Sequence, residues 1–192
     1  MRAPTRIQVK LFASPATDVP SRAVIPVFHR WIQTHAIDEL LIDVTDYGHV
    51  PRGPGVLLIG HESDYGYDLG EGRAGLLYTR KRGGSDDLGE RIHDATRRAL
   101  RAAHLLESDG SLAPLRFDTR ELLFRFPDRL HAPNDAATFE ALRASLGSTC
   151  DRIWSGAAHT LSREGDPRAP LTVVARTETA MALDALVRRA TG

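Results

Sequence analysis

Residues 49–68, HVPRGPGVLLIGHESDYGYD, place two histidines, a glutamate, two aspartates and two tyrosines around a short apolar run. Histidine nitrogens and carboxylate oxygens are ligands for zinc and for first-row transition metals. A metal held by such ligands lowers the pKa of a bound water and so promotes hydrolysis. The stretch therefore offers His61, Glu62 and Asp64 as candidate ligands of a divalent metal in a metal-dependent hydrolase.

The spacing of these residues matches no metal-binding signature. The sequence H-E-x-x-H is absent because residue 65 is a tyrosine, and the regular calcium-loop spacing is absent too. His49 and His61 flank a predicted strand and lie roughly 20 Å apart at ~3.3 Å per residue, so they share an ion only in a parallel pairing or a dimer. The sequence favours a polar hairpin loop after His61, with the metal-dependent hydrolase as the alternative.

Nucleophilic and phosphate-loop chemistry have weaker support. The sequence contains no G-x-S-x-G elbow and no G-x-x-x-x-G-K-[ST] loop. Its single cysteine, Cys150, falls on the apolar side of a predicted helix beside Leu146 and Ile153, which indicates a core position.

Recognition chemistry is the remaining interpretation. Tyr65, Tyr67, Arg80 and Arg82 are expected at one end of a hairpin, and arginine beside tyrosine is common at binding surfaces. We therefore predict a non-enzymatic binding or assembly module that uses these residues to hold an acidic small ligand or a protein partner. The sequence leaves open whether the protein is an enzyme.

Charge and composition narrow the partners. Acidic and basic residues number 25 each, so no overall field attracts nucleic acid. Four arginines on the helix predicted at 86–106 are expected to form a solvated face, because Glu90 and Asp94 interrupt their positive charge. One cysteine and no apolar run of the ~18 residues that a membrane helix needs indicate a soluble cytoplasmic protein without a membrane partner.

Apolar periodicity predicts the elements that would position these residues. Strands are expected at 6–12, 39–47, 55–61, 74–82, 115–117, 121–126, 157–164 and 170–176, and helices near 24–32, at 86–106, near 132–153 and at the C-terminal end. Short connections between successive strands imply antiparallel hairpins. The prediction is an α+β fold, a two-layer sandwich in which helices pack on a mostly antiparallel sheet.

The length of 192 residues suits a single domain, 1–192, in which two halves, 1–110 and 111–192, share a similar outline. We expect this domain to form a homodimer or another homo-oligomer. Part of the chain within residues 27–82 resembles a family of uncharacterised bacterial proteins. Three segments carry the resemblance, namely VFHRWIQ, LLIDVTDYGHVPRGPGVLLIGHESDY and GLLYTRKR. The resemblance implies a bacterial, cytoplasmic setting and assigns no site residues.

Overall fold

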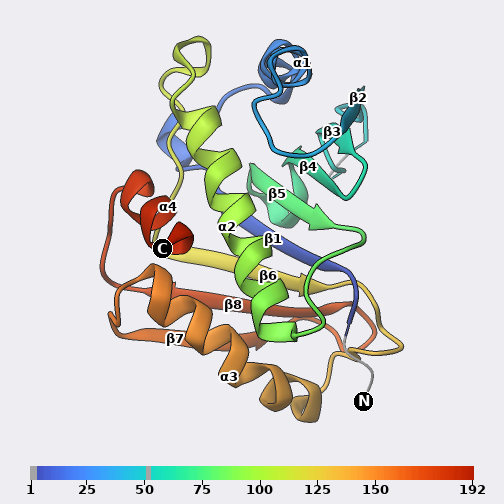
Figure 1. The fold of residues 1–192 in the computed structure, drawn as a ribbon, viewed down its shortest axis with the longest axis vertical. Coiled ribbons are helices and arrows are strands. Elements are labelled where there is room, and N and C mark those ends of the chain that lie inside the picture. Colours follow the sequence, from blue (N-terminus) through green and yellow to red (C-terminus); the bar gives the residue numbers. More distant parts are fainter. Residues whose placement is uncertain (1–3, 51–52) are drawn as a thin grey trace.

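The computed structural model describes residues 4–50 and 53–192, and this part of the chain folds into four α-helices on a sheet of eight strands (Figure 1). The strands are β1 Ile7–Phe12, β2 Leu41–Asp46, β3 Val56–Gly60, β4 Ser63–Asp68, β5 Gly75–Arg80, β6 Glu121–Phe126, β7 His159–Glu164 and β8 Leu171–Thr177. The helices are α1 Ile25–Thr34, α2 Leu88–Glu107, α3 Ala136–Ile153 and α4 Leu183–Thr191. The predicted α+β class is confirmed. None of the described helices combines the length and the apolar character that a membrane crossing requires.

The sheet runs in the order β2-β3-β4-β5-β1-β6-β8-β7. All neighbouring strands are antiparallel, as the short connections predicted. The N-terminal strand β1 lies between β5 and β6, so it joins the β2–β5 meander to the strands of the second half. Residues from both predicted halves therefore share one sheet.

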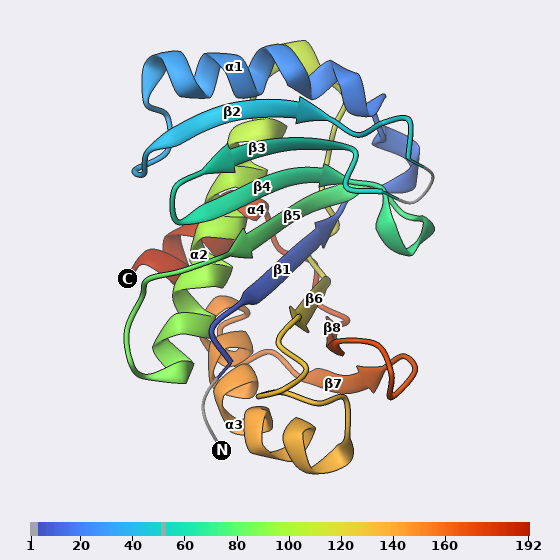
Figure 2. The same cartoon turned by 90° about the vertical axis from the view of Figure 1, so that its right-hand side faces the viewer.

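One face of the sheet carries the helices and the main hydrophobic core. Ile7, Val9 and Leu11 alternate along β1, are fully buried and belong to this core. Figure 2 shows α2, α3 and α4 on the same side of the curved sheet, with α1 next to β2 at one end. Any site on this side is therefore built between helices, or between a helix and the strand ends.

The segment predicted as a polar loop after His61 is instead a strand, β4. It pairs with β3 and β5, and Tyr65 lies opposite both Leu58 and Tyr78. Ser63, Tyr65 and Tyr67 share the core face, whereas the intervening Asp64 and Gly66 lie on the other face. Tyrosine favours strands, but aspartate is depleted in them, so the composition of this segment is typical of a loop.

One smaller expectation also needs correction. The predicted strand 115–117 contributes only an isolated bridge between Phe117 and Ala13. Residues 21–24 form a 3₁₀ turn that leads into α1. Pro26 lies in the first turn of α1, where a missing N–H is tolerated.

The face opposite the helices contains a small apolar cluster and a buried lysine. Phe12, Leu123 and Val174 form the apolar cluster. Lys10, which is fully buried, lies in the same strand as Phe12 and on the same face. The last residue of β4, Asp68, and the chain between β4 and β5 provide the oxygen atoms that surround the Lys10 ammonium group.

The Lys10 Nζ atom lies 2.5 Å from Asp68 Oδ2 and 2.9 Å from Glu71 Oε2, and it also donates to the Gly70 carbonyl at 2.9 Å. Arg125 pairs with Glu71 from the neighbouring strand β6. Burial opposes ionisation of Glu71, but hydrogen bonds from Lys10 and Arg125 outweigh it and lower the pKa of that carboxyl group. This cluster fixes the β4–β5 connection to the centre of the sheet.

Candidate functional site

The predicted ligand-binding residues do not share one exposed surface. Tyr65 and Tyr67 are fully buried and Arg80 is 1% exposed, because these residues alternate onto the helix-covered face of β4 and β5. Tyr67 donates to Asp18 Oδ1 at 2.7 Å from within the core. Arg82 is exposed beyond the end of β5. The hairpin end thus presents Arg82 to solvent, while the other three residues lie beneath the helices.

The three candidate metal ligands also separate. His61 is exposed in the turn between β3 and β4, whereas Asp64 lies on the helix-free face with its Oδ1 atom 2.7 Å from Lys81 Nζ. Glu62 contributes its backbone carbonyl to Lys81 and Arg82 N–H groups in the same turn. Within residues 4–50 and 53–192, no group of three or more His, Cys, Asp or Glu side chains is placed to hold a metal ion.

Arg80 instead forms the floor of a polar cluster under α2. Its guanidinium donates to Asp94, which also accepts from Arg97 and, at 3.1 Å, from Arg98 Nε. Burial opposes ionisation of Asp94, but the hydrogen bond from Arg97 and the charges of Arg98 and Arg80 lower the pKa of this carboxyl group. One carboxylate therefore fixes three guanidinium groups.

A second acid, Glu39, lies on the other side of Arg98. Its Oε2 atom accepts from Ser63 Oγ at 3.0 Å and lies 3.9 Å from Arg98 Nη1. Burial raises the pKa of Glu39, although the hydrogen bond from Ser63 and the charge of Arg98 oppose this shift. The Oε1 atom of Glu39 and the buried hydroxyl of Tyr65 have no hydrogen-bond partner among the described residues. The cluster is consequently polar and incompletely satisfied.

A cavity of about 300 Å³ opens beside this cluster, between α2, α4 and the connection from α1 to β2. We call it the arginine cavity; it is lined by Ala36, Ile37, Asp38, Arg97, Arg98, Arg101, Val187 and Thr191. Arg97 and Arg98 share Asp94, whereas Arg101 is exposed and makes no ion pair with any described residue. The lining of the cavity therefore contains three arginines and one acid, Asp38.

The sequence interpretation of these arginines needs correction. Arg91 is 8% exposed and Arg98 is partly buried, so the arginines of α2 are not a uniformly solvated face. Arg97, Arg98 and Arg101 follow the i, i+1, i+4 spacing that places side chains on adjacent parts of one helix surface. That spacing is the signal that could have identified the group.

Comparison of the chain with models of protein families and with curated proteins finds no match. The arrangement of the arginine cavity is therefore the basis for assigning a function.

Proposed function

We propose that the protein is a non-enzymatic binding module that holds an acidic small ligand in the arginine cavity. The observation that carries this proposal is the presence of three arginines in the lining of one small cavity that has a single lining acid. Guanidinium groups donate paired hydrogen bonds that match carboxylate and phosphate oxygens. A cavity of about 300 Å³ is large enough for a small ligand of this kind.

The cluster beneath the cavity supports the proposal through preorganisation. Asp94 fixes Arg97 and Arg98 before a ligand arrives, so less side-chain entropy is lost on binding. Asp94 and Glu39 are shared among Arg80, Arg97 and Arg98, and neither acid forms an ion pair with Arg101. An acidic ligand would supply the missing negative charge and give Arg101 a partner.

Pyrophosphate is a suitable first probe because it is small and multiply charged. We expect it to bind the wild-type protein at low salt, and we expect Arg101→Gln to weaken this binding by about tenfold, since a hydrogen bond to a charged group contributes about 1.5–3 kcal/mol. The matched control is Arg143→Gln on α3, because Arg143 is exposed and pairs only with Glu140 among the described residues. Calorimetric titration that shows equal affinity for wild type and Arg101→Gln would refute this role of the cavity.

The predicted homodimer has its own support at the β2 edge of the sheet. Strand β2 ends the sheet, α1 packs beside it, and its register with β3 shifts around Ile42. Among the described residues, four of the five exposed large apolar side chains lie in or beside this strand, namely Leu40, Ile42, Tyr47 and Val50. We infer that a second copy of the chain covers this edge.

We expect Ile42→Asp to shift the protein from dimer to monomer, because a charge would be placed in the contact between the two copies. Light scattering after size-exclusion chromatography measures the mass directly. Leu130→Asp is the control, because Leu130 is 86% exposed and lies in the connection between β6 and α3. A wild-type protein that is monomeric at high concentration would contradict the β2 interface.

A further inference from the structure

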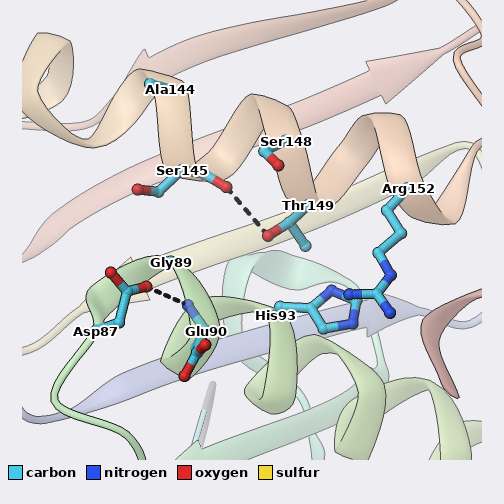
Figure 3. A pocket seen from close by; sticks show the side chains of 9 residues that line it. All are labelled: Asp87, Gly89, Glu90, His93, Ala144, Ser145, Ser148, Thr149 and Arg152. Atoms are coloured by element: carbon cyan, nitrogen blue, oxygen red, sulfur yellow. Dashed lines mark hydrogen bonds between the residues drawn. The ribbon is translucent and has the colours of Figure 1, made fainter. Parts of the chain in front are cut away.

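A second cavity, of about 440 Å³, lies between α2 and α3 (Figure 3). Figure 3 labels His93 on α2 and Arg152 on α3 among the side chains that line it, together with the hydroxyl residues Ser145, Ser148 and Thr149. It shares no lining residue with the arginine cavity. We call it the His93–Arg152 cleft and consider it separately.

The hydrogen bond of His93 defines the state of its ring. Its Nε2 atom lies 3.0 Å from the carbonyl oxygen of Ala190 on α4. A carbonyl oxygen can only accept, so Nε2 must carry the hydrogen. In the neutral ring this leaves Nδ1 as an acceptor, and that atom is buried with no donor among the described residues.

The charges around His93 keep the ring neutral near neutral pH. Burial lowers the pKa of His93, and the positive charge of Arg152 on α3 lowers it further. Arg97 on the same helix acts in the same direction, whereas Asp94 and the Ala190 carbonyl on α4 oppose the shift without reversing it. The bare Nδ1 lone pair is therefore the prevailing form.

Arg152 provides a positive charge in the lining of this cleft. It makes no ion pair with any carboxylate in the described part of the chain, although Asp87 and Glu90 line the same cleft. Asp87 caps α2 through its Oδ1 atom, which accepts from the Glu90 N–H at 2.8 Å, and neither Asp87 nor Glu90 forms an ion pair with Arg152. The cleft thus offers an acceptor that lacks a donor and a cation that lacks an anion.

We propose that the His93–Arg152 cleft binds a small oxyanion that carries its own hydrogen-bond donor, as monohydrogen phosphate and 2-hydroxycarboxylates do. His93 Nδ1 is buried, so a shift of the exposed Arg152 side chain would let the O–H group of the ligand bond to it, and the charged oxygens of the ligand would accept from Arg152. The exposed Ser148 hydroxyl provides a further donor, whereas Thr149 Oγ1 already donates to the Ser145 carbonyl at 3.0 Å. An oxyanion without a donor would instead place a lone pair against the lone pair of Nδ1.

Two pairs of probes test this inference, because each pair differs in the donor. Inorganic phosphate carries an O–H group near neutral pH, whereas sulfate does not; malate carries a hydroxyl group that succinate lacks. We expect phosphate, malate or both to move the His93 Nδ1 resonance in ring-nitrogen NMR of the wild-type protein. The matched donor-free anion should bind about tenfold more weakly, in line with the loss of one hydrogen bond and an unpaired buried acceptor. The pair that responds identifies the source of the oxyanion.

His93→Gln assigns the resonance and tests the role of Nδ1. The glutamine amide can still donate to the Ala190 carbonyl, so the contact between α2 and α4 is retained while the ring acceptor is lost. This variant should lose the preference for the donor-bearing anion, whereas Arg101→Gln should keep it, which separates this site from the arginine cavity. An unmoved Nδ1 resonance with all four anions, or equal affinity within both pairs, would overturn the inference.

Discussion

The substitution Lys10→Met is expected to lower the free energy of unfolding by about 3–5 kcal/mol, the range typical when one partner is removed from a buried ion pair. Lys10 is fully buried and is shared by Asp68 and Glu71. Methionine has a similar length, so the change removes the charge and leaves two carboxylates under the β4–β5 connection. Urea unfolding monitored by circular dichroism measures the difference.

The stability that Lys10→Met loses should become smaller as the pH falls. Lys10 helps to hold the folded-state pKa of Glu71 below its ordinary value of 4.5, so Glu71 stabilises the fold above that pH and loses this effect as the pH falls. The difference between wild type and Lys10→Met should therefore shrink in acid, where the carboxylates become protonated in both proteins. A difference that stays constant or grows in acid would contradict the ion-pair explanation.

Gln8→Met is the control for Lys10→Met, because Gln8 lies on the same face of β1 and makes one side-chain hydrogen bond, to Thr79 at 3.1 Å. Loss of that bond should cost about 1 kcal/mol. Equal effects of the two substitutions would mean that the face tolerates methionine poorly, rather than that the lysine charge is needed.

The substitution Asp94→Asn is expected to change stability and ligand binding in opposite directions. It should destabilise the fold by about 3 kcal/mol, because Arg80 is 1% exposed and would lose its charged partner. The same change removes the negative charge that Arg97 and Arg98 share beside the arginine cavity. Asparagine keeps one side-chain oxygen that can accept from these arginines, so their positioning is retained while the repulsion between Asp94 and the anion is lost. Pyrophosphate should then bind about fivefold more tightly, since the interaction between charges a few ångströms apart amounts to about 1 kcal/mol or more.

Chemical unfolding with and without pyrophosphate measures both effects in one experiment. We expect the ligand to restore more stability to Asp94→Asn than it adds to wild type, because ligand that binds only the folded state stabilises it by mass action. Glu140→Gln is the control, since Glu140 is exposed and pairs only with Arg143 among the described residues. Weaker binding to Asp94→Asn would show that Asp94 positions the arginines more than it opposes the ligand.

Period-two patterns allowed much of the sheet to be predicted from the sequence. Ile7, Val9 and Leu11 alternate with polar residues in β1, and the short connections between successive strands predicted the antiparallel hairpins. The period-two pattern failed for β4, because aspartates and a glycine occupy the helix-free face and the core face is built from serine and tyrosines. A strand whose two faces are both polar in composition resembles a loop.

The spacing of apolar residues in α3 correctly predicted that Cys150 lies in the hydrophobic core. Its side chain is fully buried, and burial raises the pKa of the thiol to about 12, so the thiolate is scarce near neutral pH. This position depended only on Leu146 and Ile153 in the same helix, which periodicity can reveal.

The arginine cavity could not be predicted in this way. Its walls come from Ala36–Asp38, from α2 and from Val187 and Thr191 in α4, segments that are far apart in the sequence. Only the order of the strands and the packing of α4 beside α2 bring them together. Likewise, His93 was not a candidate, because its importance depends on the Ala190 carbonyl and on Arg152, which belong to other helices.

The most direct test of the proposed function is to locate bound pyrophosphate by NMR of the arginine side-chain N–H groups in the wild-type protein. The arginine cavity predicts that the signals of Arg97, Arg98 and Arg101 move together as the ligand is added, while that of Arg143 stays in place. Saturable movement of the three signals at one common affinity would support a binding site in the cavity. Unchanged signals from these three arginines, or movement confined to other parts of the protein, would contradict it.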